Sequence, residues 1–293
     1  MEKIAILVDS GSDLSQALIE KLGIRVLPLK ILYDDGEYLD GENIEPQLVY
    51  ERFPGQIPKT STPNFAEITE AAESLKGEGY NRILAVCISS GLSSTYQNVC
   101  AALSEVEGIE SHVVDTKNIS IGAGVLAIYA AMLIKRGLSF TEVCANVESN
   151  IENSRIFYYM DTLDYLRAGG RIGRVTGVIG SLLNIKPIIS CNKQGIYHTV
   201  SMIRGQKRGL KKLLECVAEH YDARRETFLA VMHGSAPEVA HEVIGQLKQL
   251  YPKAQILLEK QINASLAVHT GPGLIGILLF QPRAVPAADC CRA

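Results

Sequence analysis

The chain has 293 residues, a net charge of −3 at pH 7 and a pI of about 6.1, with 47% hydrophobic and 21% charged residues. This balance is typical of a globular protein with one large or two medium domains. It argues against a generally basic surface for nucleic acid. The lack of tryptophan and the aromatic content of 6% also disfavour a stacking platform for single strands.

No segment predicts a secretion signal or a membrane span. The apolar run near the start is short and ends at Asp9, and the longest apolar segment, residues 119–134, falls short of the roughly 20 residues that a bilayer requires. We expect residues 119–134 to form a buried helix. The seven cysteines lack metal-ligand spacing, so we expect free thiols in a reducing cytoplasm, including the adjacent Cys290 and Cys291 near the end of the chain.

Strand and helix patterns alternate through the first half of the chain. The expected strands are residues 3–9, 24–33, 82–89 and 111–116, and Pro28 marks the second as an edge or bulge. The expected helices are residues 12–23, 65–77, 93–107, 119–136 and 139–153. This order predicts a parallel sheet with helices on both faces.

The pattern changes after residue 155. Residues 155–160, 185–190 and 195–204 read as strands, the last two joined by a turn at 191–195, and residues 227–234 and 254–262 read as two more. Amphipathic helices are expected at 206–221 and 236–250, and residues 269–280 end the ordered part. We therefore expect an α/β protein with an N-terminal parallel-sheet domain (1–155), a C-terminal mixed-sheet domain (156–281) and a loose tail (282–293).

Hydroxyl-rich turns recur where strands should end. The segment SSGLSSTYQN at 89–98 follows a buried strand, and similar turns lie at 57–64, 9–13 and 268–273. A ligand commonly binds at the carboxyl ends of parallel strands, where a helix N-terminus also favours an anion. Helix capping is the competing explanation for each turn, and for Asp9 it is the preferred one. Several such turns in one chain predict that they converge at one crevice.

The familiar catalytic motifs are missing. The sequence has no phosphate-binding loop with a glycine–lysine pair, no complete nucleophile elbow, no dinucleotide fingerprint after the first strand and no closely spaced metal ligands. Neutral hydroxyls and one imidazole suit the binding of a carboxyl or carbonyl head group, with an apolar channel for the rest of the ligand.

Taken together and in order, these segments resemble the DegV family, the bacterial fatty-acid-binding proteins also called FakB. The segments are ILVDSGSDL, KTSTP, SSGLSSTYQN, VVDT, LDYLRAGGRIG, IKPII and HTGPGLIG, and they cover the chain to about residue 281. The resemblance implies two α/β domains with one long-chain fatty acid between them, and no other cofactor. It also implies that the protein is not an enzyme. A separate ATP-dependent kinase subunit would phosphorylate the fatty acid for phospholipid synthesis.

The resemblance also implies site residues. The expected fatty-acid-binding residues are Thr60, Ser61, Ser93, His269 and Thr270. Arg171 matches the family arginine near the head-group opening, where it would contact the head group or the kinase; an internal salt bridge is the alternative.

This sequence departs from the family pattern at three positions. Ser94 stands where the family usually has glycine, Thr62 where it has glutamine, and Asn64 where it has serine. None of these departures removes Thr60 or Ser93, so the expected head-group contacts remain. The chain-length preference for the fatty acid is the property they put in question.

Some residues and functions stay open at this stage. One set of apolar side chains could line the acyl slot or simply pack the core: Leu163, Leu166, Ile172, Val178, Ile179, Leu182 and Leu183. One alternative function is a serine hydrolase of lipid esters, in which Ser93, His269 and Asp115 would act together. Another is a lipid-sensing regulatory module. We expect no nucleic-acid partner and no stable membrane insertion.

Overall fold

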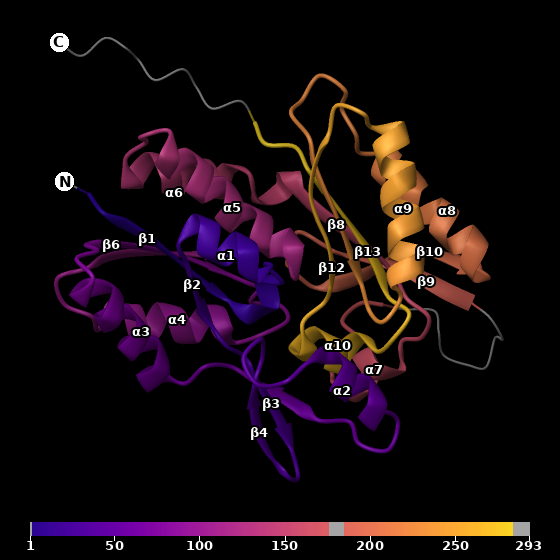
Figure 1. Cartoon of the computed structure of the whole chain (residues 1–293), viewed down its shortest axis with the longest axis horizontal. Coiled ribbons are helices and arrows are strands. Elements are labelled where there is room, and N and C mark those ends of the chain that lie inside the picture. Colours follow the sequence, from indigo (N-terminus) through magenta and orange to yellow (C-terminus); the bar gives the residue numbers. More distant parts are fainter. Residues whose placement is uncertain (1, 176–184, 284–293) are drawn as a thin grey trace.

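A parallel sheet organises the N-terminal half of the chain in the computed structural model, which describes residues 2–175 and 185–283 (Figure 1). Its strands run in the order β2-β1-β6-β7. They are β1 (Ile4–Asp9), β2 (Ile24–Leu27), β6 (Arg82–Cys87) and β7 (Glu110–Asp115). The strands are rich in branched apolar residues because helices cover both faces of the sheet. The predicted parallel sheet is confirmed.

The helices divide between the two faces of this sheet. On one face, α3 (Phe65–Gly77) and α4 (Thr95–Ser104) pack over residues such as Leu7 and Ile83. On the other face lies α5 (Ile121–Lys135), flanked by α6 (Phe140–Ser149), while α1 (Gln16–Leu22) follows the short turn after β1. Helix α5 also packs against the second sheet, so nearly its whole surface is buried, as its uniform hydrophobicity predicts.

A six-stranded mixed sheet organises the second half. Its order is β10-β9-β8-β13-β11-β12, and only β11 and β12 pair in parallel. Its strands are β8 (Ser154–Tyr159), β9 (Ile185–Cys191), β10 (Tyr197–Arg204), β11 (Phe228–His233), β12 (Gln255–Gln261) and β13 (Ile275–Phe280). Helices α8 (Gln206–Ala218) and α9 (Pro237–Leu250) cover one face (Figure 1). We propose residue 155 as the domain boundary, because the change from parallel to mixed sheet falls there.

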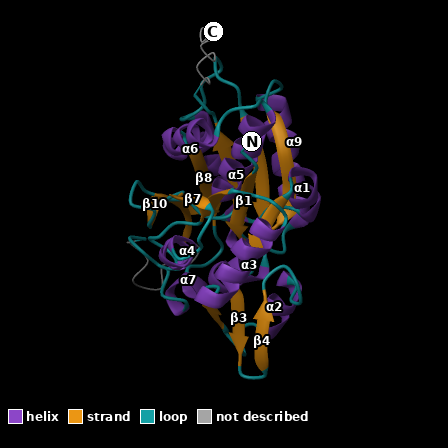
Figure 2. Ribbon diagram, turned by 90° about the vertical axis from the view of Figure 1, so that its left-hand side faces the viewer, coloured by secondary structure: helices purple, strands orange, loops and turns teal. Residues whose placement is uncertain are grey.

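The segment 24–33 is not one strand, which corrects our expectation. Pro28 separates β2 from β3 (Lys30–Tyr33), and β3 pairs instead with β4 (Gly36–Leu39) and β5 (Lys59–Ser61) in a small antiparallel sheet. Figure 2 shows β3 and β4 projecting from the molecule beside α2 (Pro46–Arg52). Proline has no N–H to donate to a sheet, so the chain leaves the first sheet there.

The helix α10 (Ala264–Thr270) was not expected from the sequence, and it brings the second half of the chain against the first. Buried Asp40 accepts hydrogen bonds from the Ser265 N–H (3.1 Å), the Ser265 hydroxyl (2.5 Å) and the Ser10 hydroxyl (2.7 Å). Asp13 accepts one from the Asn263 N–H at 2.7 Å. The carboxylates thus hold the first turn of α10 on the N-terminal half.

Burial raises the pKa of Asp9 from 3.8 to about 7 and that of Asp13 to about 6. Between about pH 4 and pH 7 the folded chain therefore keeps protons that the unfolded chain has released. This contribution stabilises the protein at about pH 5 and is lost as the pH rises through 7. We expect chemical denaturation to show that the free energy of unfolding falls about 1–3 kcal/mol more between pH 5 and pH 8 in wild type than in Asp9→Asn. Equal slopes would contradict this.

Candidate functional site

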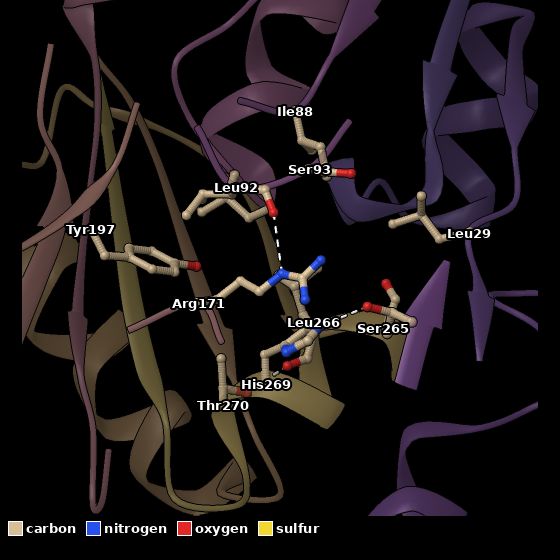
Figure 3. Close-up of a pocket in the computed structure, with 12 residues that line it drawn as sticks. Leu29, Ile88, Leu92, Ser93, Arg171, Tyr197, Ser265, Leu266, His269 and Thr270 are labelled. Carbon is tan, nitrogen blue, oxygen red and sulfur yellow. Dashed lines mark hydrogen bonds between the residues drawn. The ribbon is translucent and has the colours of Figure 1, made fainter. Parts of the chain in front are cut away.

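A cavity opens where the segments that follow β2 and β6 meet α10 and the loop after α7 (Asp164–Ala168) (Figure 3). Five of the expected site residues line it: Thr60, Ser93, Arg171, His269 and Thr270. Between these polar groups lie apolar side chains, among them Leu29, Ile88, Leu92, Ile119 and Leu266. Three of the four hydroxyl-rich segments, at 57–64, 89–98 and 268–273, therefore meet at this cavity, whereas no residue of the fourth, at 9–13, lines it.

A polar contact in the cavity joins Thr60 of β5 to His269 of α10. The Thr60 Oγ1 lies 2.7 Å from His269 Nε2. Burial, helped by the positive charge of Arg171, lowers the pKa of His269 to about 4, so the imidazole is neutral at pH 7. Its Nδ1 atom is buried without a hydrogen-bond partner in the described structure.

The missing partner at Nδ1 indicates which ring nitrogen carries the proton. A buried N–H without a partner is more costly than a buried acceptor without one, so the proton belongs on Nε2. His269 then donates to the Thr60 oxygen, and the Thr60 O–H is left to donate into the cavity. This arrangement suits a ligand that accepts hydrogen bonds, such as a carboxylate.

Gly169 makes room for the imidazole. A Cβ atom at this position would lie 2.1 Å from His269 Nδ1, although the backbone of Gly169 is in the ordinary helical region with φ at −78°. The glycine is therefore required by close packing against His269 and not by backbone conformation.

Ser93 borders the cavity and also accepts a hydrogen bond from the first residue of α4. Its Oγ accepts a hydrogen bond from the Thr95 N–H at 3.2 Å and lies 2.8 Å from the Thr95 hydroxyl. Ser89 has a different task, because its buried hydroxyl donates to the Gly195 carbonyl of the β9–β10 turn at 2.8 Å. One serine of this segment therefore bonds to the start of α4, and another joins the N-terminal half of the chain to the C-terminal half.

Thr62 lies just after β5, the strand that carries Thr60. Its hydroxyl accepts a hydrogen bond of 2.7 Å from Asn98 Nδ2 of α4. The bond ties the turn that carries Thr60 to the helix that begins just after Ser93. Thr62 therefore connects the segment that carries Thr60 to the segment that carries Ser93, and both residues line the cavity.

Arg171 supplies a positive charge that has no carboxylate partner among the described residues. Its Nε donates to the Leu92 carbonyl at 3.3 Å, as Figure 3 shows, and Nη1 donates to the Gly169 carbonyl at 2.7 Å. No ion pair to Arg171 occurs among the described residues. The expected alternative of an internal salt bridge is therefore wrong, and the guanidinium remains available to an anion at the cavity.

The structure places three further residues, Ser61, Thr270 and Asp9, in different roles. Ser61 is exposed, donates to the Thr62 carbonyl at 3.4 Å and does not line the cavity, because successive residues of β5 point to opposite sides. The Thr270 hydroxyl donates to the Leu266 carbonyl at 2.9 Å. Asp9 caps the turn after β1 as expected, since its carboxylate accepts from the Gly11 N–H at 3.0 Å.

Sequence reasoning missed Tyr197 and Ser265, which also line the cavity. Tyr197 lies in an expected strand and Ser265 in the unexpected helix α10. No local motif marks either residue, so only the tertiary arrangement could have found them.

The described residues leave a small space for an acyl chain at the cavity. The cavity leaves about 50 Å³ for the centres of water-sized molecules, and its whole empty space, open solvent included, is about 480 Å³. A ligand pocket typically has about 300–1,000 Å³. Leu163, Leu166 and Ile172 belong to or pack against the main apolar core. The other expected slot residues, Val178, Ile179, Leu182 and Leu183, lie outside the described residues, as do Cys290 and Cys291.

The residues proposed for a hydrolase do not form a triad. His269 Nε2 is bonded to Thr60 and not to Ser93, and the Asp115 carboxylate is paired with Lys117 at 2.5 Å.

Within residues 2–175 and 185–283, no group of three His, Cys, Asp or Glu side chains could hold a metal ion. In the same ranges, no helix has both the length and the apolar character to cross a bilayer. The five described cysteines are free thiols: Cys87, Cys100, Cys144, Cys191 and Cys216.

A parallel and a mixed sheet around a cavity with hydroxyl, imidazole and guanidinium groups define an α/β binding protein. The chain belongs to the DegV family, because the family model described as "Uncharacterised protein, DegV family" matches residues 3–281. A DegV domain-containing protein of Clostridium acetobutylicum is 38% identical over 284 residues, with 96% of this chain and 100% of the relative covered.

Solved structures of the same family have the same fold. DegV of Bacillus subtilis, described as a fatty acid binding protein, has a TM-score of 0.87 and 27% identity, covering 97% of this chain and 100% of that one. A fatty-acid-binding DegV family protein of Thermus thermophilus has a TM-score of 0.88 and 28% identity, covering 95% and 99%. A stearic-acid-binding protein of Eubacterium ventriosum has a TM-score of 0.88 and 25% identity, covering 95% and 98%.

The contact between Gly169 and His269 can be tested by adding one methyl group. We expect Gly169→Ala to displace the imidazole, break its hydrogen bond to Thr60 and destabilise the protein by about 1–3 kcal/mol in chemical denaturation. Gly245→Ala is the matched control, because α9 leaves open space there and alanine favours a helix by up to about 1 kcal/mol. Equal effects of the two substitutions would show that Gly169 does not make room for the imidazole.

Proposed function

We propose that this protein binds one long-chain fatty acid, with its carboxylate at the cavity mouth and its alkyl chain between the two sheets. The observation that carries the proposal is the Thr60–His269 pair, which leaves a hydroxyl free to donate at an apolar cavity beside an unpaired arginine. Family members whose structures resemble this chain are described as fatty-acid-binding proteins, which supports the same ligand class here.

The head group would be held mainly by neutral donors. A carboxylate accepts hydrogen bonds from the hydroxyls of Thr60 and Ser93, and Arg171 adds a positive charge nearby. The neutral imidazole of His269 orients Thr60 without adding a second charge. Because a weakly charged mouth holds the carboxylate loosely, the head group stays accessible to chemistry from outside.

The alkyl chain would supply most of the affinity. Each buried CH₂ group contributes about 0.8 kcal/mol, so a long chain can offset the cost of moving apolar side chains apart. Because the described residues leave little space at the cavity, we infer that the alkyl chain moves apolar side chains apart as it enters. The ligand would then bind the open conformation more tightly than the closed one. Its binding would shift the protein toward the open conformation.

The bound fatty acid would be the substrate of a separate kinase subunit in the cytoplasm. That subunit would transfer the γ-phosphoryl group of ATP to a carboxylate oxygen, which yields an acyl phosphate and ADP for phospholipid synthesis. The unpaired guanidinium of Arg171 supports this division of labour, since it lies at the mouth where the charge of the transferring group would develop. The carrier role also fits a site in which Ser93 and His269 do not pair.

Removal of one hydroxyl should weaken binding without unfolding the protein. We expect Thr60→Ala and Ser93→Ala each to raise the Kd for a long-chain fatty acid by about tenfold, as loss of a hydrogen bond to a charged group predicts. A fluorescent fatty-acid titration measures the Kd, and thermal unfolding checks the fold. Ser61→Ala is the control, because that exposed neighbour does not line the cavity. Unchanged affinity in both Thr60→Ala and Ser93→Ala would reject the head-group assignment.

The role of Arg171 is tested separately. We expect Arg171→Ala to leave fatty-acid affinity within about threefold of wild type but to slow acyl phosphate formation by about tenfold or more when the kinase and ATP are added. Arg204→Ala, at an exposed position at the end of β10, is the control for loss of one positive charge. A normal rate with Arg171→Ala would refute the role in phosphoryl transfer while leaving fatty-acid binding standing.

A further inference from the structure

A second cavity lies at the opposite end of the mixed sheet from α10, near the start of β11 and the end of β13 (Figure 1). Its volume is about 240 Å³. We call it the arginine pocket, after four of its lining residues: Arg136, Arg224, Arg225 and Arg283. Tyr129 and Glu226 also line it. It shares no lining residue with the cavity that contains Thr60 and His269.

Two of the four arginines have protein partners. Arg224 forms two hydrogen bonds of 2.9 Å to the Asp222 carboxylate, and Arg225 donates to the Gln281 carbonyl. The guanidinium groups of Arg136 and Arg283 have no hydrogen-bond or ion-pair partner in the part of the chain that the structure describes. The pocket therefore carries positive charge that is not neutralised locally.

Tyr129 provides an independent sign that the arginine pocket takes a ligand. The residue is only 3% exposed, and its ring packs edge-on against Phe280 at 5.5 Å. Its hydroxyl is buried and has no hydrogen-bond partner in the described structure. A buried hydroxyl without a partner is costly, so its presence beside a cavity calls for a polar occupant.

The lining also restricts the chemistry of that occupant. Glu226 lies on the pocket, and its carboxylate accepts a hydrogen bond from Gln255 Nε2 at 3.1 Å. The negative charge of Glu226 repels any anion, but the four arginines leave the lining positive overall. A highly charged anion therefore gains more from this lining than a weakly charged one. A phosphate group carries about −1.5 to −2 charge at pH 7 and offers three acceptor oxygens, which matches planar guanidinium donors and one hydroxyl.

We propose that the arginine pocket binds a phosphate group, presented by a small soluble molecule or by a lipid head group. Arg136 and Arg283 supply the charge-assisted hydrogen bonds, and the Tyr129 hydroxyl donates a further one. Arg224 and Arg225 add positive charge while they remain held by Asp222 and Gln281.

Two binding measurements on the full chain test the site. Isothermal titration uses inorganic phosphate and inorganic pyrophosphate, and flotation uses phosphatidylcholine vesicles with and without phosphatidic acid. We expect wild type to bind at least one phosphate probe, and Arg136→Ala/Arg283→Ala to weaken that binding by about tenfold or more. Binding of the soluble probes assigns a soluble ligand, and selective binding of the phosphatidic acid vesicles assigns a lipid head group.

The control for loss of two positive charges is Lys211→Ala/Lys248→Ala, at exposed positions on α8 and α9. This pair should bind the probes as wild type does. Tyr129→Phe should also weaken binding but should not lower the free energy of unfolding, because the hydroxyl has no partner to lose. The proposal is overturned if wild type binds neither kind of probe, if the lysine pair loses binding equally, or if Tyr129→Phe binds as wild type does.

Discussion

The arrangement of the candidate site depends on how helix α10 is held. Asp40 and Asp13, from the first forty residues, accept hydrogen bonds from Ser265 and Asn263 at the start of this helix. Its other end then presents His269 to Thr60, which lies 209 residues away in sequence. Seven residues of helix could not keep this position unaided, since so short a helix is unstable in isolation. The buried carboxylates therefore position the imidazole at the cavity.

Each polar group at the cavity mouth makes a different contact. A neutral imidazole fixes the direction of one hydroxyl, a second hydroxyl accepts a hydrogen bond from the first residue of α4, and the arginine is held by two carbonyl oxygens. None of these hydrogen bonds is made to a carboxylate of the protein. This arrangement supports our proposal that the site takes an acid from outside, and the apolar side chains behind it support an acid with a long hydrocarbon chain.

The sequence predicted those parts of the fold that local patterns determine. Branched apolar runs marked β1, β6 and β7, and the turn at 191–195 marked the β9–β10 hairpin. The family resemblance led us to expect Thr60, Ser93 and His269 at one site, although Thr60 lies in β5 and His269 in α10 rather than in turns. The sequence could not predict the bond between Asp40 and Ser265, which joins residues 225 apart with no local pattern. The need for Gly169 likewise arises from packing against His269, which only the folded chain reveals.

The central claim is that the cavity mouth belongs to a slot for one intact fatty acid. Native mass spectrometry of the full chain, purified without detergent, tests this most directly. We expect one long-chain fatty acid per chain, released unmodified on denaturation and regained when a fatty acid is added to stripped protein. A chain that carries no lipid after purification and takes up none when it is supplied would contradict the claim.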